Sequence, residues 1–407
     1  MLNNGWELLT EDFRREIEKG LKVSRLKRLL VRILKTPSYQ TEFFEGDPMI
    51  QNFIRRVVKP ELVSRGIRNI TIDKMGNLIA TIKSRRGGPK IMLLAYAMTA
   101  APGSMKDAFS GKIMDGSRYG YSGEVAWGRG ASEQKGSLAS AIESLSIISE
   151  SRSGPAGEVV FVLSTAGETG RHDSLRQVVE EDGVEADYAI VTLGEPRIQL
   201  GNKGRIDAQV VVEGKACHSS TPWDGLNAID GMVLVLQRLG RLMPNPDAKT
   251  HPHLGKATLT PTFIESFPRA THTVQAKCVL TLDRRLLPGD DPKEALAQLA
   301  DAIGNLEPYK VSVEPRAFMY PCEVPEGCPI AQTIAEGIRV VLGKQPEYSY
   351  SHGAIDTGYL NVKGIEAVNF GAGNYKFLHT DTDVVSLEDA ANAAKLYAYA
   401  AMAGVKG

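Results

Sequence analysis

Continuous apolar runs alternate with amphipathic stretches over the first half of the chain. Residues 5–35 and 47–66 carry apolar side chains every three or four positions, which predicts helices. Residues 90–98, 157–166 and 186–196 are apolar throughout, as expected of strands buried on both faces, and residues 136–151 predict a helix between the first two. This alternation predicts an α/β domain with a mainly parallel central sheet.

The pattern changes near residue 203. Residues 204–216 alternate polar and apolar positions, residues 225–243 and 292–306 predict amphipathic helices, and residues 272–292 and 309–315 predict further strands. We therefore expect a small α+β domain over residues 204–315, inserted into a larger domain formed by residues 1–203 and 316–407. A strand at 364–373 and a helix at 386–404, with Ser386 as its N-cap, complete the larger domain.

Composition narrows the classes of function. The 407 residues include 48 basic and 48 acidic side chains, so no polyanion-binding surface is indicated and we expect no nucleic-acid partner. The apolar runs are far shorter than the roughly 20 residues that cross a bilayer, and the charged N-terminus does not resemble a secretory signal. None of the four cysteines forms a CxxC pair, which favours a reducing cytoplasm.

Four polar residues follow the predicted strands of the larger domain. Glu133 lies in "WGRGASEQKG", Glu168 in "STAGETG", Glu195 in "TLGEP" and His379 in "NYKFLHTDTD". A single glutamate in a glycine loop is usually a helix cap or a surface charge, and a single histidine is usually just hydrogen-bonded. Ligand sites in α/β sheets lie beyond the carboxyl ends of the strands, and three carboxylates with one imidazole there suit a divalent cation.

The ordered motifs resemble the M20 family of metallopeptidases and amidohydrolases, which includes succinyl-diaminopimelate desuccinylase, acetylornithine deacetylase and glutamate carboxypeptidases. The matching stretches are "LLAYAMTAAP", "WGRGASEQKGSLA", "STAGETG", "TLGEP", "GKACHSSTPWDGLNAI", "LDRRLLPGD" and "NFGAGNYKFLHTDTD", in family order over nearly the whole chain. The resemblance implies a catalytic metal-binding α/β domain and an inserted ferredoxin-like lid that dimerises. It also implies two metal ions that share a bridging aspartate, and a glutamate as general base.

Several positions depart from the family pattern. The histidine of the first metal falls on Ala97, and the aspartate that orients it falls on Thr99. The bridging aspartate becomes Glu133, and the general base falls on Gly167. These losses concern one of the two metals, together with the group that held its ligand.

The second metal keeps a complete set of ligands by the same resemblance, namely Glu133, Glu168 and His379. We therefore expect a mononuclear site with one divalent ion per chain, either Mn²⁺ or Zn²⁺. Glu195, freed from metal binding, is our candidate for the missing general base. His352 is a second candidate, although a histidine there is more often a surface or core-edge residue.

The lid supplies the remaining candidates. By resemblance, His218 donates to the negative charge that develops on the substrate, and Arg285 holds a substrate carboxylate, with Arg284 as the neighbour that could exchange roles with it. Asn227, Tyr375 and again His352 are further candidate substrate contacts. Each of these residues also has a structural reading, as a turn, cap or solvated rim residue.

Two functions compete. The first is a hydrolase that cleaves a C–N bond in a small, non-standard substrate, either by amide deacylation or by removing an aromatic amine, as in the related 5-nitroanthranilate aminohydrolase. The second is a non-catalytic binding or scaffolding protein that keeps the fold. The retained polar residues favour the enzyme, because polar groups held in an abandoned cleft cost stability. We expect a homodimer formed through the lid, with no nucleic-acid or membrane partner.

Overall fold

The structure is a computed structural model that describes residues 3–84, 86–242 and 249–405. It divides into two compact units, the first formed by Met1–Leu200, Val324–Ser349 and Leu360–Gly407 and the second by Gly201–Glu323 and Tyr350–Tyr359. The sequence placed residues 201–203, 316–323 and 350–359 in the larger domain, so the units differ from that expectation. One reason is that the last long strand of the second unit extends to Met319, which pairs with Arg205. The other is that the Lys203 N–H donates to the Ser351 carbonyl at 3.0 Å, which ties residues near 351 to the second unit.

The first unit is built on a mixed sheet with the order β1-β2-β6-β3-β7-β17-β8. Its centre is parallel, since β6, β3, β7 and β17 all run in one direction, while β2 and β8 add antiparallel strands at the flanks. The strands are β1 (Ile70–Ile72), β2 (Leu78–Ile82), β3 (Gly88–Tyr96), β6 (Gly157–Ser164), β7 (Tyr188–Val191), β8 (Ile198–Asn202) and β17 (Glu366–Asn369). This sheet confirms the predicted fold class.

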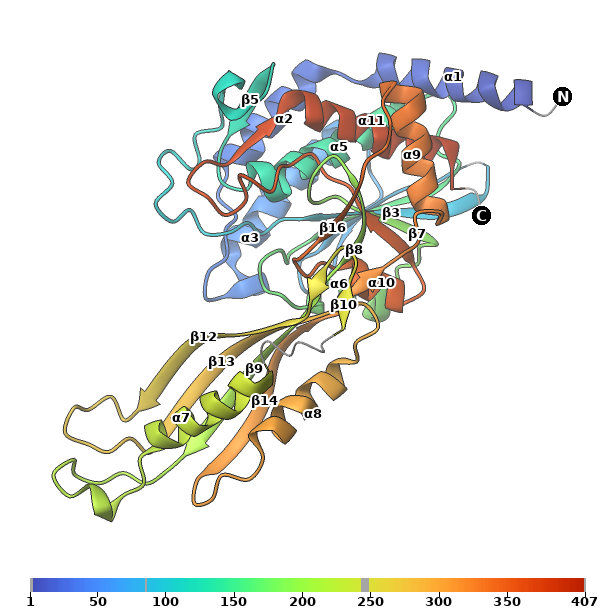
Figure 1. Ribbon diagram of the computed structural model, residues 1–407. Helices are drawn as coiled ribbons and strands as arrows, with labels where there is room; N and C mark the ends of the chain where they lie inside the picture. Colours follow the sequence, from blue (N-terminus) through green and yellow to red (C-terminus); the bar gives the residue numbers. More distant parts are fainter. Residues whose placement is uncertain (1–2, 85, 243–248, 406–407) are drawn as a thin grey trace. The chain divides into compact units, whose positions relative to one another are not determined.

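Helices α5, α9 and α11 pack on this sheet, and α1 and α2 pack against α5 and α11 (Figure 1). Within the described residues, no helix is both long and apolar enough to cross a membrane. The first unit's helices are α1 (Asn3–Gly20), α2 (Val23–Lys35), α3 (Pro48–Phe53), α4 (Lys59–Ser64), α5 (Gly136–Glu150), α6 (Asp173–Arg176), α9 (Pro329–Leu342) and α11 (Leu387–Ala403). The Ser386 hydroxyl accepts the Asp389 N–H, which confirms the predicted N-cap of α11.

A small antiparallel sheet, β18-β5-β4, also belongs to the first unit. It consists of β4 (Lys112–Asp115), β5 (Glu124–Trp127) and β18 (Val384–Ser386). The side chains of Val125, Val384 and Phe377 form its core. This sheet was not predicted from the sequence. The pairing of its strands β5 and β18 brings the candidate site residues together, as described below.

The second unit is a ferredoxin-like β-α-β-β-α-β fold, as the resemblance implied. Its antiparallel sheet has the order β12-β13-β9-β14, and its core lies between this sheet and the two helices. The elements are β9 (Gly204–Glu213), α7 (Ala228–Leu239), β12 (Thr258–Phe267), β13 (Lys277–Leu286), α8 (Pro292–Ile303) and β14 (Lys310–Met319), with short strands β10 (Thr250–His251), β11 (Gly255–Lys256) and β15 (Cys322–Glu323). In sequence, β16 (Tyr348–Ser351) and α10 (Thr357–Val362) span points where the chain passes between units.

Candidate metal centre

The small sheet brings two distant loops together. Strands β5 and β18 pair antiparallel with Val384 opposite Trp127. The chain leaves β5 toward a π-helical turn, Ala131–Lys135, that carries Glu133, and it enters β18 from a loop that carries His379. Antiparallel pairing therefore places the exit of one strand beside the entrance of the other, so Glu133 and His379 meet although 246 positions separate them in the chain.

A buried carboxylate fastens these two loops. Asp383 is 1% exposed, and its carboxylate accepts the backbone N–H of Gly130 at 2.7 Å and of Ser132 at 2.8 Å. Its own carbonyl accepts the Gly128 N–H at 3.1 Å. Burial raises the pKa of Asp383 to about 6, although the two backbone donors oppose this shift. The sequence analysis missed Asp383, for which the available signal was a second aspartate in "HTDTD" just before an apolar pair.

Three of the predicted site residues converge. One ligand atom from each of Glu133, Glu168 and His379 lies within 4.8 Å of the others. The Nε2 atom of His379 is 3.1 Å from Oε1 of Glu133 and 3.9 Å from Oε2 of Glu168. The two carboxylates are each 13% exposed, whereas the His379 side chain is 52% exposed and forms the open side of the group.

The electrostatics of this group fit a cation. Burial, and then the adjacent charge of Glu133, raise the pKa of Glu168 to about 8. The hydrogen bond to Glu133 raises the pKa of His379 to about 9. Two half-buried carboxylates this close repel each other, and a bound cation relieves that repulsion. The donor set of carboxylate oxygens and one imidazole nitrogen is one that Zn²⁺ and Mn²⁺ accept.

Two positions that the resemblance assigns to the other metal, Ala97 and Thr99, are buried. The three residues that follow β3, Ala97, Met98 and Thr99, are fully buried. A Cβ atom added to Gly130 would lie 2.3 Å from Cγ2 of Thr99, and one added to Gly167 would lie 2.3 Å from the carbonyl oxygen of Met98. The backbone thus approaches the end of β3 from two sides. Ala97 itself is fully buried.

Glu195 and Tyr375 lie together on another loop pair of the first unit. The Tyr375 N–H donates to Oε1 of Glu195 at 3.1 Å, and the Arg197 guanidinium is 3.8 Å from Oε2 of Glu195. The Tyr375 hydroxyl donates to Oε1 of Gln199 at 2.7 Å. Both carboxylate oxygens of Glu195 therefore face a donor, and Glu195 is not a member of the three-ligand group.

Two predicted residues of the lid lie in the second unit, beside the start of α7. The backbone N–H of Ser220 approaches Nδ1 of His218 at 3.2 Å, so Nδ1 is an acceptor and the ring proton resides on Nε2. His218 can therefore act as a hydrogen-bond donor through Nε2. Asn227 caps α7, because its Oδ1 accepts the Ile229 N–H at 3.2 Å. Asn227 therefore has the capping role that was the alternative to a substrate contact.

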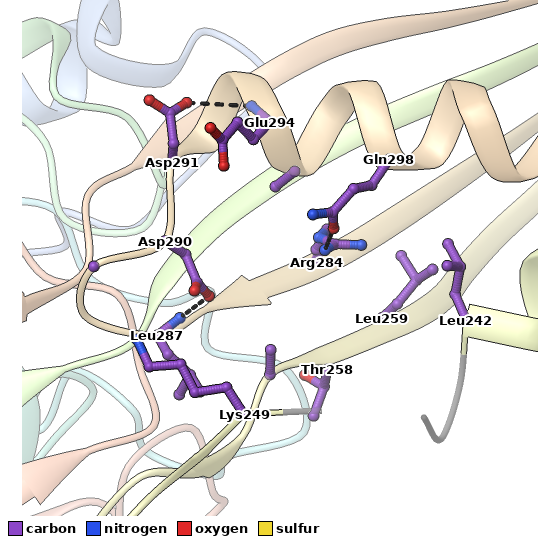
Figure 2. Close-up of a pocket in the computed structure, with 13 residues that line it drawn as sticks. Leu242, Lys249, Thr258, Leu259, Arg284, Leu287, Asp290, Asp291, Glu294 and Gln298 are labelled. Carbon is purple, nitrogen blue, oxygen red and sulfur yellow. Dashed lines mark hydrogen bonds between the residues drawn. The ribbon is translucent and has the colours of Figure 1, made fainter. Parts of the chain in front are cut away.

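The two lid arginines occupy opposite faces of β13, because successive side chains alternate along a strand. Arg285 is held by Asp283 through two hydrogen bonds of 2.8 and 2.9 Å, and it donates to the His352 carbonyl at 3.4 Å. Arg284 instead donates to Oε1 of Gln298 on α8 at 2.6 Å (Figure 2). Burial lowers the pKa of Arg284. Arg285, rather than Arg284, therefore contacts the backbone of His352.

Comparisons with known proteins agree on one family. The sequence profile of peptidase family M20/M25/M40 matches residues 102–403. A LysW-lysine/LysW-ornithine hydrolase of Sulfurisphaera tokodaii is 24% identical over 388 residues, which cover 92% of this chain and 94% of the relative.

Solved structures share the fold. The M20 family metallo-carboxypeptidase Sso-CP2 of Sulfolobus solfataricus superposes with a TM-score of 0.74 at 17% identity, over 92% of this chain and 97% of that one. The YXEP protein of Bacillus subtilis, a dinuclear metal-binding peptidase of the M20 family, superposes with a TM-score of 0.66 at 16% identity. The superposition covers 94% of this chain and 98% of that one. At these identities the likeness shows the fold alone.

Proposed function

The chain belongs to peptidase family M20/M25/M40, and from that premise we propose that it hydrolyses a C–N bond in a small, non-standard substrate with a mononuclear metal site. The family match confirms the predicted class, a metal-dependent amidohydrolase of the M20 type. The alternative of a non-catalytic scaffold is not favoured by these findings. The substrate, the number of ions and the roles of single residues are the parts that we propose here.

The convergence of Glu133, Glu168 and His379 is the observation that carries the proposal. We assign these three residues as ligands of one Mn²⁺ or Zn²⁺ ion. A bound divalent ion polarises a substrate oxygen or nitrogen and lowers the pKa of water. The closed end of β3, where Ala97 and Thr99 are fully buried, supports one ion rather than the two of the B. subtilis relative.

We assign the proton acceptor to Glu195. Its carboxylate is held in place by the Tyr375 N–H and by Arg197 at 3.8 Å, and a fixed carboxylate is suited to orient or deprotonate water. Replacing Glu195 by Gln keeps the size of the side chain and removes the base. We expect kcat to fall at least 100-fold with the metal content unchanged. Full activity of Glu195→Gln would transfer the role to another group, with His352 as the next candidate.

The lid residues are assigned to substrate binding. The Nε2–H of His218 is a donor for negative charge on the substrate. Arg285, held by Asp283, offers a guanidinium edge to a carboxylate, and we expect Arg285→Lys to raise KM more than it lowers kcat. Tyr375 acts through Glu195. Asn227 and Arg284 are secondary candidates, because Asn227 caps α7 and Arg284 faces Gln298 on α8.

Two substrate types fit this machinery. Amides of amino acids are the first, since a relative of 24% identity is named as a LysW-lysine/LysW-ornithine hydrolase. An aromatic amine, removed with water, is the second, and it is supported by the departures at Ala97, Thr99 and Gly167 from the pattern that the resemblance implies. Release of a carboxylic acid distinguishes the first reaction from release of ammonia in the second.

We propose that the active form is a homodimer in the cytoplasm. The exposed apolar side chains Ile229, Val233 and Leu234 on α7 and Phe263 and Ile264 on β12 are 40–57% exposed. Strand β12 ends its sheet, so its outer edge offers backbone groups to the same strand of a second copy. All four cysteines remain thiols, which supports a reducing compartment. We expect the double substitution Val233→Glu/Phe263→Glu to halve the molecular mass that light scattering measures in solution. Val362→Glu, at an exposed position of the first unit, is the control and should leave this mass unchanged.

The metal content of protein purified without chelator tests the central proposal. We expect about one Mn or Zn per chain by elemental analysis, and loss of both metal and C–N hydrolysis in His379→Ala. Asp381→Ala is the matched control, because Asp381 lies two positions away and contacts Ser104 on the surface. Two ions per chain would overturn the mononuclear site. Metal-free protein after reconstitution with Mn²⁺ and Zn²⁺ would overturn the proposed function.

A further inference from the structure

Gln134 follows Glu133 in the π-helical turn and touches a second ligand directly. Its side chain is buried, at 2% exposure, and its Nε2 donates to Oε1 of Glu168 at 2.7 Å. Glu168 belongs to the loop after β6, so this bond joins the turn to a different part of the unit. It is a hydrogen bond to a charged or easily charged group, which is stronger than one between neutral partners.

A contribution to folding stability does not explain why position 134 carries an amide side chain. Its Oε1 atom is buried without a hydrogen-bond partner among the described residues. A buried acceptor without a partner costs about 1–3 kcal/mol, so an apolar side chain of the same length would suit this position better. With Glu168 ionised, as a metal ligand must be, reversing the amide would turn the carbonyl oxygen toward a carboxylate that has no proton to donate. The contact with Glu168 is therefore the reason to retain glutamine.

The two oxygens of Glu168 face different partners. Oε1 meets Gln134 at 2.7 Å, whereas Oε2 is the atom that lies 3.9 Å from Nε2 of His379, within the ligand group. We propose that Gln134 is a positioning residue: by holding Oε1, it leaves a single oxygen of Glu168 for the metal ion. This inference rests on the proposed function, because it assumes that Glu168 is a ligand.

A carboxylate limited to one oxygen affects which ion the site prefers. Zn²⁺ is satisfied by about four ligands, whereas larger or harder cations seek more oxygen donors and often bind both oxygens of a carboxylate. Gln134 thus biases the site toward Zn²⁺ over Mn²⁺. Freeing Oε1 would allow Glu168 to bind through both oxygens and would favour Mn²⁺.

The substitution Gln134→Met tests this role, because methionine fills the space without a donor. We expect the Kd for Zn²⁺ to rise about 10- to 100-fold, as for other groups that orient a metal ligand, and the Zn²⁺/Mn²⁺ preference to shift toward Mn²⁺. We expect the Tm of the metal-free protein to change little, because removal of the unpartnered carbonyl offsets loss of the bond to Oε1 of Glu168. A merely structural residue would lower this Tm and would leave the preference unchanged. Gln134→Asn, too short to reach Glu168, should weaken Zn²⁺ in the same way if the Met variant does not fold.

A matched control and a double-mutant cycle complete the design. Gln177 is also buried, at 5% exposure, and donates to Asp182 at 2.9 Å, so Gln177→Met should leave the Kd unchanged. In a Glu168→Ala background, Gln134→Met should have no further effect on the Kd, because Gln134 acts only through Glu168. An unchanged Zn²⁺ affinity in Gln134→Met, with wild-type protein binding one ion, would overturn the inference alone. Wild-type protein that binds neither ion would overturn the proposed function as well.

Discussion

The close approach of Gly167 to Met98 gives the sharpest test of how the site is built. A Cβ atom at position 167 would lie 2.3 Å from the Met98 carbonyl oxygen and 3.1 Å from its carbonyl carbon. That carbonyl cannot retreat freely, because the adjacent Thr99 is held from both sides by Ser38 and Gln40 at 2.9 and 2.8 Å. Such overpacking costs about 1–3 kcal/mol, and the lost chain entropy of glycine returns about 0.4–1 kcal/mol. We therefore expect Gly167→Ala to destabilise the protein by about 1–2 kcal/mol.

Denaturant unfolding of the purified protein measures this cost. Gly123→Ala is the control, since a Cβ atom at Gly123 would meet nothing within 4 Å, and it should leave the unfolding free energy unchanged. Gly167→Glu, which reintroduces the carboxylate at the position of the family's base, should show no gain in hydrolytic activity and at least the same loss of stability. If Gly167→Ala were as stable as wild type and Gly167→Glu more active, the end of β3 would have room for a base, and our reading of a closed site would be refuted.

Three further outcomes are expected. Because Glu168 and His379 have pKa values raised to about 8 and 9, protons compete with the ion, so metal affinity should rise steeply from pH 6 to pH 9 in competition titrations; a flat profile would speak against these ligands. Asp383→Asn keeps the size of the residue but weakens its grip on the Glu133 loop, and should raise the metal Kd about 10-fold or more by calorimetry; an unchanged Kd would contradict the fastening role. Glu143→Gln removes the fully buried charge that Arg65 binds at 2.8 Å, and should lower the unfolding free energy by about 3–5 kcal/mol; a loss below about 1 kcal/mol would place that ion pair among the weak surface pairs.

Strong periodicity allowed most of the fold to be predicted. The helices at 136–151 and 292–306 and the antiparallel strand at 204–216 lie within a few residues of α5, α8 and β9. Strand β12 was missed, since Pro261 interrupts its pattern and proline usually argues against a strand. The structure resolves the conflict by placing β12 at the edge of its sheet, with a register shift between Pro261 and Phe263.

The candidate site was predictable only in part. The types of residue at strand exits, together with the resemblance, selected Glu133, Glu168 and His379, and the structure groups these three. Their approach depends on the pairing of β5 with β18, two short strands of four and three residues that are too short for a periodic signal. The contact of Gln134 with Glu168 was equally hidden, because it joins segments 34 positions apart.

Three of the departures from the family pattern, at Ala97, Thr99 and Gly167, lie together at one place in the fold. Ala97 and Thr99 follow β3 and Gly167 follows β6, and these two strands are parallel neighbours, so all three positions lie at one edge of the sheet. A side chain at position 167 would meet the Met98 carbonyl oxygen, and a side chain at position 130 would meet Thr99, so both neighbouring loops lie close against the residues that follow β3. Glu133 and His379 are brought together by β5, β18 and Asp383, and Gly130 of the Glu133 loop also lies against Thr99. Burial at the end of β3 therefore leaves the pairing of β5 with β18 in place, which supports the single ion proposed above, although Glu168 directly follows Gly167 and shares that end of the sheet.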